Sequence, residues 1–223
     1  MTIFELNFFG INIAPSYYGL MYVLSFLIGY FYIKSKKIIN NKKLDDLLLI
    51  LIVGMILGGR TFYVLFYDLS YYLNNISEIF MPWKGGMSFH GGAFGFIISA
   101  YLFCRKNNIK FFGFMDELAI VGAIGIGFGR IGNYINKELL GFKYNGFLAV
   151  EKNGNFYFPS PLIEAFLEGL VLFIILFFIN KYKKFSGLTS ICFLIFYAIF
   201  RIFVEIFFRT PDSQIGYIYG FLT

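Results

Sequence analysis

Three arginines stand inside long apolar stretches of this sequence, where a charged side chain is rare and costly. They are Arg60, Arg130 and Arg201. An arginine carries a planar fork of N–H donors that suits the oxygens of a phosphate or a carboxylate. One arginine near a helix end could simply extend to the membrane surface, but three of them favour a site for an anionic group.

The densest candidate motif covers residues 129–141, with the sequence GRIGNYINKELLG. Arg130 and Asn133 are three residues apart, so on a helix they share one face and could hold one ligand together. Glycines at 122, 125, 127, 129 and 132 allow a second backbone or a ligand to approach closely. A glycine-packed helix with a capping asparagine would explain the glycines but not the arginine.

Two further groups could handle protons or charge. His90, the only histidine, precedes two glycines at the start of an apolar run, and imidazole exchanges protons near neutral pH. A lone histidine is more often structural, so both interpretations stay open. Tyr197, Arg201, Glu205 and Arg209 are spaced by four and form one helical stripe. There the arginine and glutamate either make a structural ion pair, or the pair orients Arg201 toward a ligand.

The elements that position these residues are set by the composition. Of 223 residues, 58% are hydrophobic and only 14% are charged, whereas a soluble domain carries about a quarter charged residues. The sequence therefore predicts a membrane protein, and no hydrophilic stretch is long enough to divide residues 1–223 into more than one domain. Two cysteines and one histidine give no disulfide framework and no metal site. The net charge of +6 fits basic cytoplasmic loops rather than nucleic acid.

Six apolar runs of about bilayer length predict an all-α polytopic bundle with six transmembrane helices. Loops after the first, third and fifth runs hold 11 Lys and Arg residues, against 5 in the other loops and the tail. This bias places the N-terminus outside and those loops in the cytoplasm. The three arginines then lie ~20–24 Å along their helices, near the outer leaflet, at the depth of Tyr18, His90 and Glu205. The six runs are residues 17–33, 44–66, 87–104, 115–131, 162–180 and 188–208.

These motifs resemble those of the bacterial prolipoprotein diacylglyceryl transferases. Residues 129–141 are similar to that family's signature segment. Further matching segments occur in the family's order along the chain: residues 16–22 (SYYGLMY), 57–60 (LGGR), 85–92 (GGMSFHGG), Phe200 and Arg201 with Glu205, and 209–212 (RTPD).

The resemblance implies a seven-helix fold in the bacterial inner membrane, with the N-terminus and the active site on the outer side. It implies transfer of the diacylglyceryl group of phosphatidylglycerol to the lipobox cysteine of a preprolipoprotein. A thioether forms, glycerol 1-phosphate leaves, and no metal or organic cofactor takes part. The implied partners are phosphatidylglycerol, the lipobox signal peptide and the bilayer, and no nucleic acid.

Matching positions carry the site over to this chain. The catalytic candidates are His90, Tyr18, Arg130 and Arg201, because the phosphate must be held as it leaves and the thiol must lose a proton. Either His90 or Tyr18 could assist that proton transfer. The lipid-binding candidates are Arg130, Asn133, Glu138, Gly141, Arg201 and Glu205, to which the intramembrane position adds Arg60.

The chain departs from the family pattern at a few positions. Lys137 stands where the signature usually has glycine, Phe142 where an arginine often follows, and Phe158 where a histidine precedes Pro159. The sequence ends at Thr223, where the family continues into a final helix, so we expect a C-terminally truncated member with six helices. One alternative is an inactive relative. The other is a transporter or channel for anionic lipid or solute, which predicts polar residues through the full membrane depth, whereas the cytoplasmic half is nearly all Leu, Ile and Phe.

Overall fold

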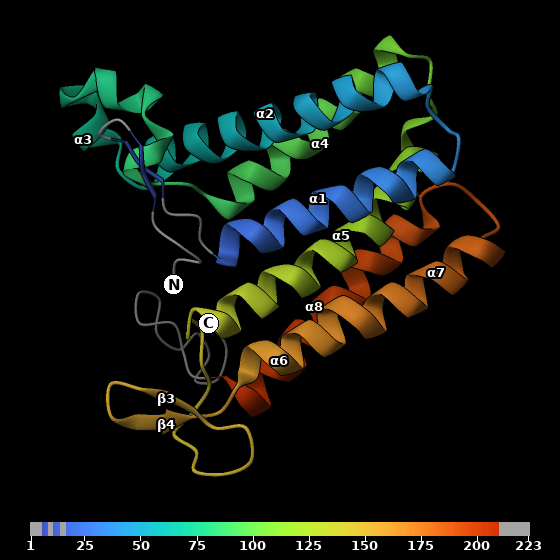
Figure 1. The fold of residues 1–223 in the computed structure, drawn as a ribbon. Coiled ribbons are helices and arrows are strands. Elements are labelled where there is room, and N and C mark those ends of the chain that lie inside the picture. Colours follow the sequence, from blue (N-terminus) through green and yellow to red (C-terminus); the bar gives the residue numbers. More distant parts are fainter. Residues whose placement is uncertain (1–5, 9–10, 14–16, 210–223) are drawn as a thin grey trace. The chain divides into compact units, whose positions relative to one another are not determined.

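The computed structural model describes residues 6–8, 11–13 and 17–209 of the chain (Figure 1). They belong to two compact units, one formed by Met1–Tyr32 with Asp116–Thr223 and the other by Ile33–Met115. The predicted all-α class is confirmed, since the only strands in the described ranges form two short antiparallel hairpins. These pair β1 (Leu6–Phe8) with β2 (Ile11–Ile13) and β3 (Val150–Lys152) with β4 (Asn155–Tyr157).

Every apolar run predicted from the sequence forms a helix, with bounds within four residues of those expected. The short helices α3 (Leu69–Asn74), η1 (Ile76–Phe80) and η2 (Pro82–Lys84) were not predicted, because they are too short to show an apolar period. The long helices are α1 (Tyr17–Ser35), α2 (Asn41–Phe66), α4 (Phe89–Lys106), α5 (Phe111–Ile135), the continuous helix formed by α6 (Ser160–Glu164), η3 (Ala165–Val171) and α7 (Leu172–Tyr182), and α8 (Leu188–Phe208).

Four of these helices are long and apolar enough to cross a bilayer, which fits a multi-pass membrane protein. They are Asn41–Phe66, Phe111–Ile135, Ser160–Tyr182 and Leu188–Phe208. α-Helices suit this setting because they pair their backbone N–H and C=O groups within the segment, as the lipid interior requires. That α1 and α4 also cross the membrane, and that the N-terminus lies outside, stay predictions.

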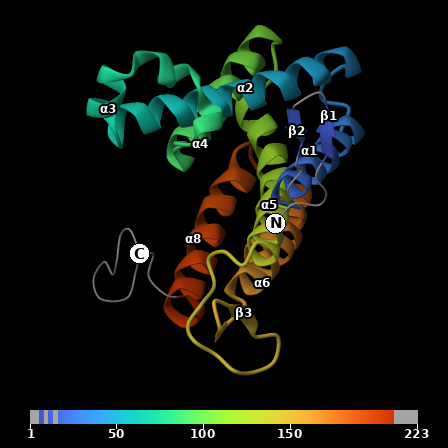
Figure 2. The same cartoon turned by 60° about the vertical axis from the view of Figure 1, so that its left-hand side comes forward.

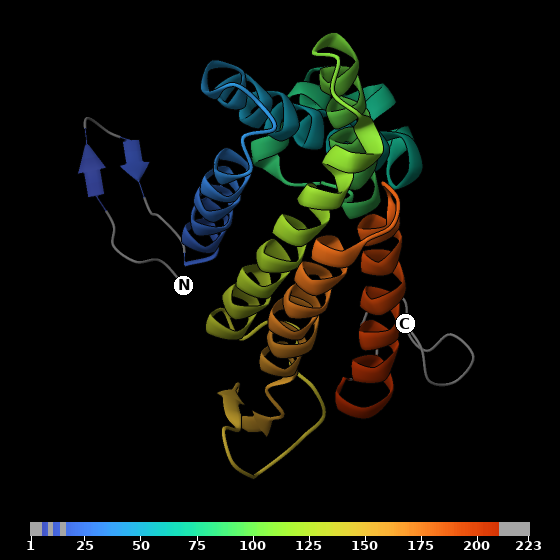
Figure 3. The same cartoon turned by 90° about the vertical axis from the view of Figure 1, so that its right-hand side faces the viewer.

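The core of the first unit is an apolar seam between its long helices. Ile120 and Ala123 of α5 and Leu172 and Leu176 of α7 are fully buried, and aromatic side chains of α8 such as Phe196 pack against them. In Figures 1 and 3 these helices run side by side. The seam therefore holds α5, α7 and α8 in register along much of their length.

A buried carboxylate fixes one end of this bundle. Asp116 of α5 accepts hydrogen bonds from the backbone N–H groups of Gly187 (2.8 Å) and Ser190 (2.9 Å), so it caps α8 from a neighbouring helix. It also pairs with Lys183 Nζ at 2.8 Å, which neutralises its charge. Gly187 adopts φ 100°, a backbone conformation that favours glycine in the tight turn between α7 and α8. Asp116 is 14 residues from Arg130, about 21 Å along α5. The contacts of Asp116 therefore hold together the end of the bundle that is remote from the arginines.

The second unit is built on a close crossing of α2 and α4 (Figure 2). A Cβ added at Gly58 would lie 2.8 Å from Gly95 Cα, and one added at Gly91 would overlap the carbonyl of Gly58. Glycines on both faces thus allow the two backbones to touch, as is common between membrane helices. This contact positions the start of α4, where His90 lies, against the end of α2.

Candidate functional site

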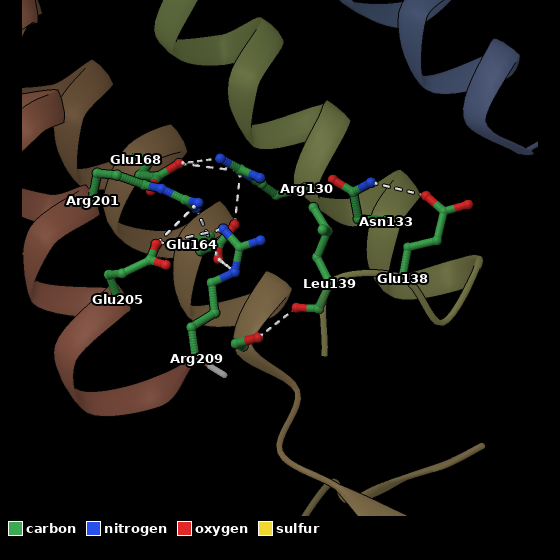
Figure 4. Close-up of polar contacts among 10 residues, drawn as sticks. Arg130, Asn133, Glu138, Leu139, Glu164, Glu168, Arg201, Glu205 and Arg209 are labelled. Atoms are coloured by element: carbon green, nitrogen blue, oxygen red, sulfur yellow. Dashed lines mark hydrogen bonds and ion pairs between the residues drawn. The ribbon is translucent and has the colours of Figure 1, made fainter. Parts of the chain in front are cut away.

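Two of the intramembrane arginines meet on one carboxylate (Figure 4). Arg130 Nε of α5 lies 2.9 Å from Glu164 Oε2, and Arg201 Nη1 of α8 lies 3.3 Å from Glu164 Oε1. Glu164, at the end of α6, is fully buried. One carboxylate therefore bridges guanidinium groups from two separate helices and sets the distance between them.

Further charged side chains complete the cluster around this bridge. Glu168 Oε2 lies 3.1 Å from Arg130 Nη2, and Glu205 Oε2 lies 3.1 Å from Arg201 Nη2. Arg209 approaches both Glu164 (3.8 Å) and Glu205 (3.7 Å). Among the residues that the structure describes, the cluster holds three arginines and three glutamates, so their formal charges balance. Balanced pairing is what permits so many charges in a water-poor interior.

Two guanidinium nitrogens in this cluster keep unused hydrogen-bonding capacity. Arg201 Nη1 and Arg209 Nη1 are buried and make no hydrogen bond to any residue in the described part of the chain. Their contacts with carboxylates have ion-pair distances without hydrogen-bond geometry. A buried N–H group that makes no hydrogen bond is costly, so these nitrogens are available to donate hydrogen bonds to a ligand oxygen.

The sequence around the cluster explains why the helices come this close. A Cβ added at Gly169 would lie 2.6 Å from Gly127 Cα, so α5 and η3 cross where each has a glycine. Gly127 precedes Arg130 by one helical turn, and Gly169 directly follows Glu168. The stretch η3 is π-helical, an irregularity that is frequent at functional sites, and it begins directly after Glu164.

The motif at 129–141 contains the C-terminal turn of α5, which brings two of its side chains into contact. Glu138 N–H donates to the Asn133 carbonyl (2.9 Å) and Lys137 N–H to the Tyr134 carbonyl (3.0 Å), which is the Schellman arrangement. Lys137 takes φ 55° at the position where glycine is preferred, which gives a physical reason for the glycine usual in the family. The turn brings Glu138 Oε2 to 3.1 Å from Asn133 Nδ2.

The rest of the motif is attached to the start of α6 and the end of α8. Ser160 Oγ donates to the Leu139 carbonyl at 2.8 Å, and Gly141 N–H donates to the Phe158 carbonyl at 2.9 Å. A Cβ at Gly141 would overlap the backbone oxygen of Phe208, so only glycine fits. Two departures from the family pattern lie together here: the rings of Phe142 and Phe158 stack at 5.3 Å and 16°.

Tyr18 lies at the same end of the first unit. A Cβ at Gly132 would meet the Tyr18 ring at 2.8 Å, so this glycine makes room for the phenol against α5. The Tyr18 hydroxyl accepts a hydrogen bond from Tyr22 at 3.3 Å. The first unit thus gathers most of the candidates at one end of its helices: Tyr18, Arg130, Asn133, Glu138, Gly141, Arg201 and Glu205.

His90 and Arg60 belong to the second unit, so their meeting with the other candidates stays a prediction. His90 is the second residue of α4 and is exposed, and Ser88 caps that helix by accepting the Gly91 N–H at 3.3 Å. Arg60 is buried and donates to backbone carbonyls of residues 78–86. Lys84 of that loop and Tyr71 of α3 donate hydrogen bonds to the Glu78 carboxylate and hold its pKa below the usual value.

Sequence reasoning gave no role to Glu164 or Glu168, although both lie at the centre of the cluster. Their spacing puts two like charges on one face of an apolar helix with no basic residue beside them. Three arginines inside apolar runs need acidic partners, which was the available signal. Which acids serve which arginines depends on the crossing of separate helices and is not visible in the sequence.

The comparisons with known proteins all point to one family. The family model for prolipoprotein diacylglyceryl transferase matches residues 4–223. A protein of Rickettsia felis is 48% identical over 95% of this chain and 85% of its own length. Relatives in Rickettsia bellii (46% identical, 95% and 84% covered) and Rickettsia akari (47%, 95% and 85%) are similar. All three are named phosphatidylglycerol–prolipoprotein diacylglyceryl transferase.

Proposed function

Because the chain belongs to the prolipoprotein diacylglyceryl transferase family, we propose that it carries out the first step of bacterial lipoprotein maturation. It transfers the diacylglyceryl group of phosphatidylglycerol to the lipobox cysteine of a preprolipoprotein. The cysteine sulfur bonds to the glyceryl carbon that carries the phosphate, and the bond from that carbon to the phosphate oxygen breaks. Glycerol 1-phosphate leaves with the electron pair, and the thiol proton passes to a base.

The observation that carries this proposal is that Arg201 and Arg209 each have a buried guanidinium nitrogen that makes no hydrogen bond within the described part of the chain. These nitrogens are ion-paired with Glu164 and Glu205 but make no hydrogen bond to them, and a phosphodiester offers oxygens to which they can donate. The cluster is already neutral, so net positive charge cannot be what holds the lipid there. Directed hydrogen bonds from forked guanidinium groups are the better account, because such bonds strengthen as negative charge builds on the leaving phosphate.

The other residues of the first unit suit the headgroup of this lipid. The terminal glycerol of phosphatidylglycerol carries hydroxyls that both donate and accept hydrogen bonds. Glu138 can accept from them and Asn133 can do both, and the Schellman turn already holds these two side chains 3.1 Å apart. We therefore assign Asn133, Glu138 and the Gly141 backbone to headgroup binding and Tyr18 to the wall beside them.

His90 is our candidate base. A lipobox thiol has an ordinary pKa near ~8.5, so most of it is protonated at neutral pH. His90 is exposed at the start of α4, and a helix N-terminus favours an anion such as a thiolate. Help from a positioned base contributes ~10²- to 10⁴-fold. The competing role is that His90 only hydrogen-bonds the lipid, with the arginines lowering the pKa of the thiol.

We place the protein in the bacterial inner membrane with its site toward the outer leaflet. The support is the excess of basic residues in the loops at 34–43, 105–110 and 181–186, which marks them as cytoplasmic. In the first unit, Lys183 lies at the end of the bundle where it pairs with Asp116, and the arginine cluster lies at the other end.

The direct test is transfer of a labelled diacylglyceryl group from phosphatidylglycerol to a lipobox peptide by the full chain in vesicles. A peptide with serine in place of the lipobox cysteine, and phosphatidylethanolamine in place of phosphatidylglycerol, are the controls. Labelled thioether on the cysteine peptide alone is the expected result. Lipid binding without transfer would indicate an inactive relative, and lipid movement between leaflets without transfer would indicate a transporter.

A further inference from the structure

Arg60 differs from the arginines of the first unit in how its donors are used. It is 5% exposed, and its guanidinium makes five hydrogen bonds to backbone carbonyl oxygens. A guanidinium has five N–H groups, so its capacity is filled. The Tyr72 ring lies beside it, 4.8 Å from Arg60 Cζ. The acceptors are Ile79 (3.0 Å), Gly85 (2.6 Å), Gly86 (3.0 Å), Met81 (3.4 Å) and Glu78.

The loop that supplies these carbonyls is shaped for the purpose. Gly85 and Gly86 adopt φ 89° and 78°, in the region that favours glycine, and this turn directs both of their carbonyls at Arg60 Nη1. A Cβ at Gly86 would lie 2.9 Å from Arg60 Nη1 and 2.6 Å from the Tyr63 ring. The two glycines are therefore accounted for by contact with the arginine, with no ligand required.

A lipid phosphate could reach Arg60 only by displacing these carbonyls. Each displaced carbonyl would lose its hydrogen bond to the buried guanidinium, and the loop would have to move away from Arg60. Arg201 is the opposite case, because it has a buried nitrogen that makes no hydrogen bond among the described residues. Two arginines that look alike in the sequence thus have different capacities for an added ligand.

The loop of residues 78–88, which we call the Arg60 clamp together with the arginine that holds it, ends at the start of α4, close to His90. Ser88 lies two residues after Gly86. Its N–H donates at 2.9 Å to the carbonyl of Gly59, the residue directly before Arg60. Ser88 is also the N-cap of α4. The arginine, the loop and the first turn of α4 are therefore connected through successive hydrogen bonds within the second unit.

We propose that Arg60 is a positioning residue that folds the 78–88 loop and so fixes the start of α4 that carries His90, and that it is not a phosphate ligand. The loop then takes this form with or without lipid. The role of the clamp in transfer rests on the proposed function, whereas the clamp itself can be measured without any substrate.

The rate of trypsin cleavage after Lys84 measures how often the loop of residues 78–88 opens. This side chain is 49% exposed, so cleavage there is limited by opening of the loop. The full chain in detergent, without lipid substrate, is treated with trypsin, and the fragment ending at residue 84 is quantified by mass spectrometry. Arg60→Lys keeps the charge but has only three donors, so we expect cleavage to be at least about 10-fold faster. Lys84→Gln identifies the fragment by removing it.

Two more variants separate the clamp from general damage. Gly86→Ala keeps the guanidinium but strains the turn that faces it, so it should accelerate the same cleavage. Tyr71→Phe removes only the outer hydrogen bond to the Glu78 carboxylate and should leave cleavage unchanged. If Arg60→Lys fails to fold, Gly86→Ala decides, and wild-type cleavage in that variant would overturn the proposal.

Kinetics distinguish the clamp from lipid binding. With Arg60→Lys we expect kcat to fall while the half-saturating concentration of phosphatidylglycerol stays within about 2-fold, because lipid contacts are unchanged. Wild-type cleavage together with a half-saturating concentration raised about 10-fold or more would identify Arg60 as a lipid ligand instead. If no variant or wild-type chain showed transfer, the proposed function would fail, yet the cleavage result would still decide the clamp.

Discussion

Glu164→Gln is the sharpest perturbation of the arginine cluster. Glutamine has nearly the same shape, but one of its two oxygens becomes an NH₂ group. At Glu164 both oxygens face guanidinium nitrogens, 2.9 Å away at Arg130 and 3.3 Å away at Arg201. The substitution therefore places a donor against a donor and removes the bridge between α5 and α8.

The size of the effect follows from the burial and the remaining partners. Removing one member of a buried ion pair costs about 3–5 kcal/mol. We take the lower end, about 3 kcal/mol, because Glu168 and Glu205 still pair with the two arginines. If that loss appears in the transition state for transfer, the rate falls about 10²-fold.

The assay is transfer of labelled diacylglycerol to a lipobox peptide, measured over a range of phosphatidylglycerol concentrations. We expect kcat to fall while the half-saturating lipid concentration falls or stays constant, since the cluster gains a net positive charge. Glu117→Gln is the matched control: it neutralises a buried carboxylate on α5 that bonds Tyr32 and Asn180, away from the cluster. A normal rate in Glu164→Gln, or equal losses in both variants, would refute the bridging role.

Four further predictions use the same chain. Arg201→Lys keeps the charge but loses the fork, so the transfer rate should fall at least ~10-fold; unchanged transfer with lysine at both 130 and 201 would show that charge alone suffices. His90→Gln should lower transfer at pH 7 by at least ~10²-fold, with partial recovery at higher pH as the thiol ionises by itself; near-normal activity at pH 7 would make His90 a scaffold residue. Lys137→Gly should raise the free energy of unfolding by about 1 kcal/mol, because φ 55° favours glycine, and an unchanged or lower melting temperature would contradict this. Single cysteines placed in residues 35–43 or 181–186 should resist a membrane-impermeant thiol reagent in intact cells, whereas ready labelling would reverse the proposed orientation.

The helices of this protein are determined largely by the sequence alone. A bilayer requires about 20 apolar residues per span with every backbone group paired, so each apolar run could form little else. The end of α5 was set locally as well, by the turn at Lys137 that brings Glu138 back to Asn133. Composition and motif order were likewise sufficient to indicate the family.

Tertiary structure decided what each charged residue does. Glu164 serves Arg130 and Arg201 only because α5 and η3 cross at Gly127 and Gly169, a contact between segments about 40 residues apart in the sequence. Arg60 and Arg201 both stand in apolar runs and carry the same side chain. The donors of Arg60 are filled by a loop whose backbone path cannot be predicted from local sequence. Arg201 keeps a buried nitrogen that makes no hydrogen bond to the residues that the structure describes. Hydrogen-bond capacity depends on which acceptors arrive from elsewhere in the chain, so it is set by the fold and not by residue type.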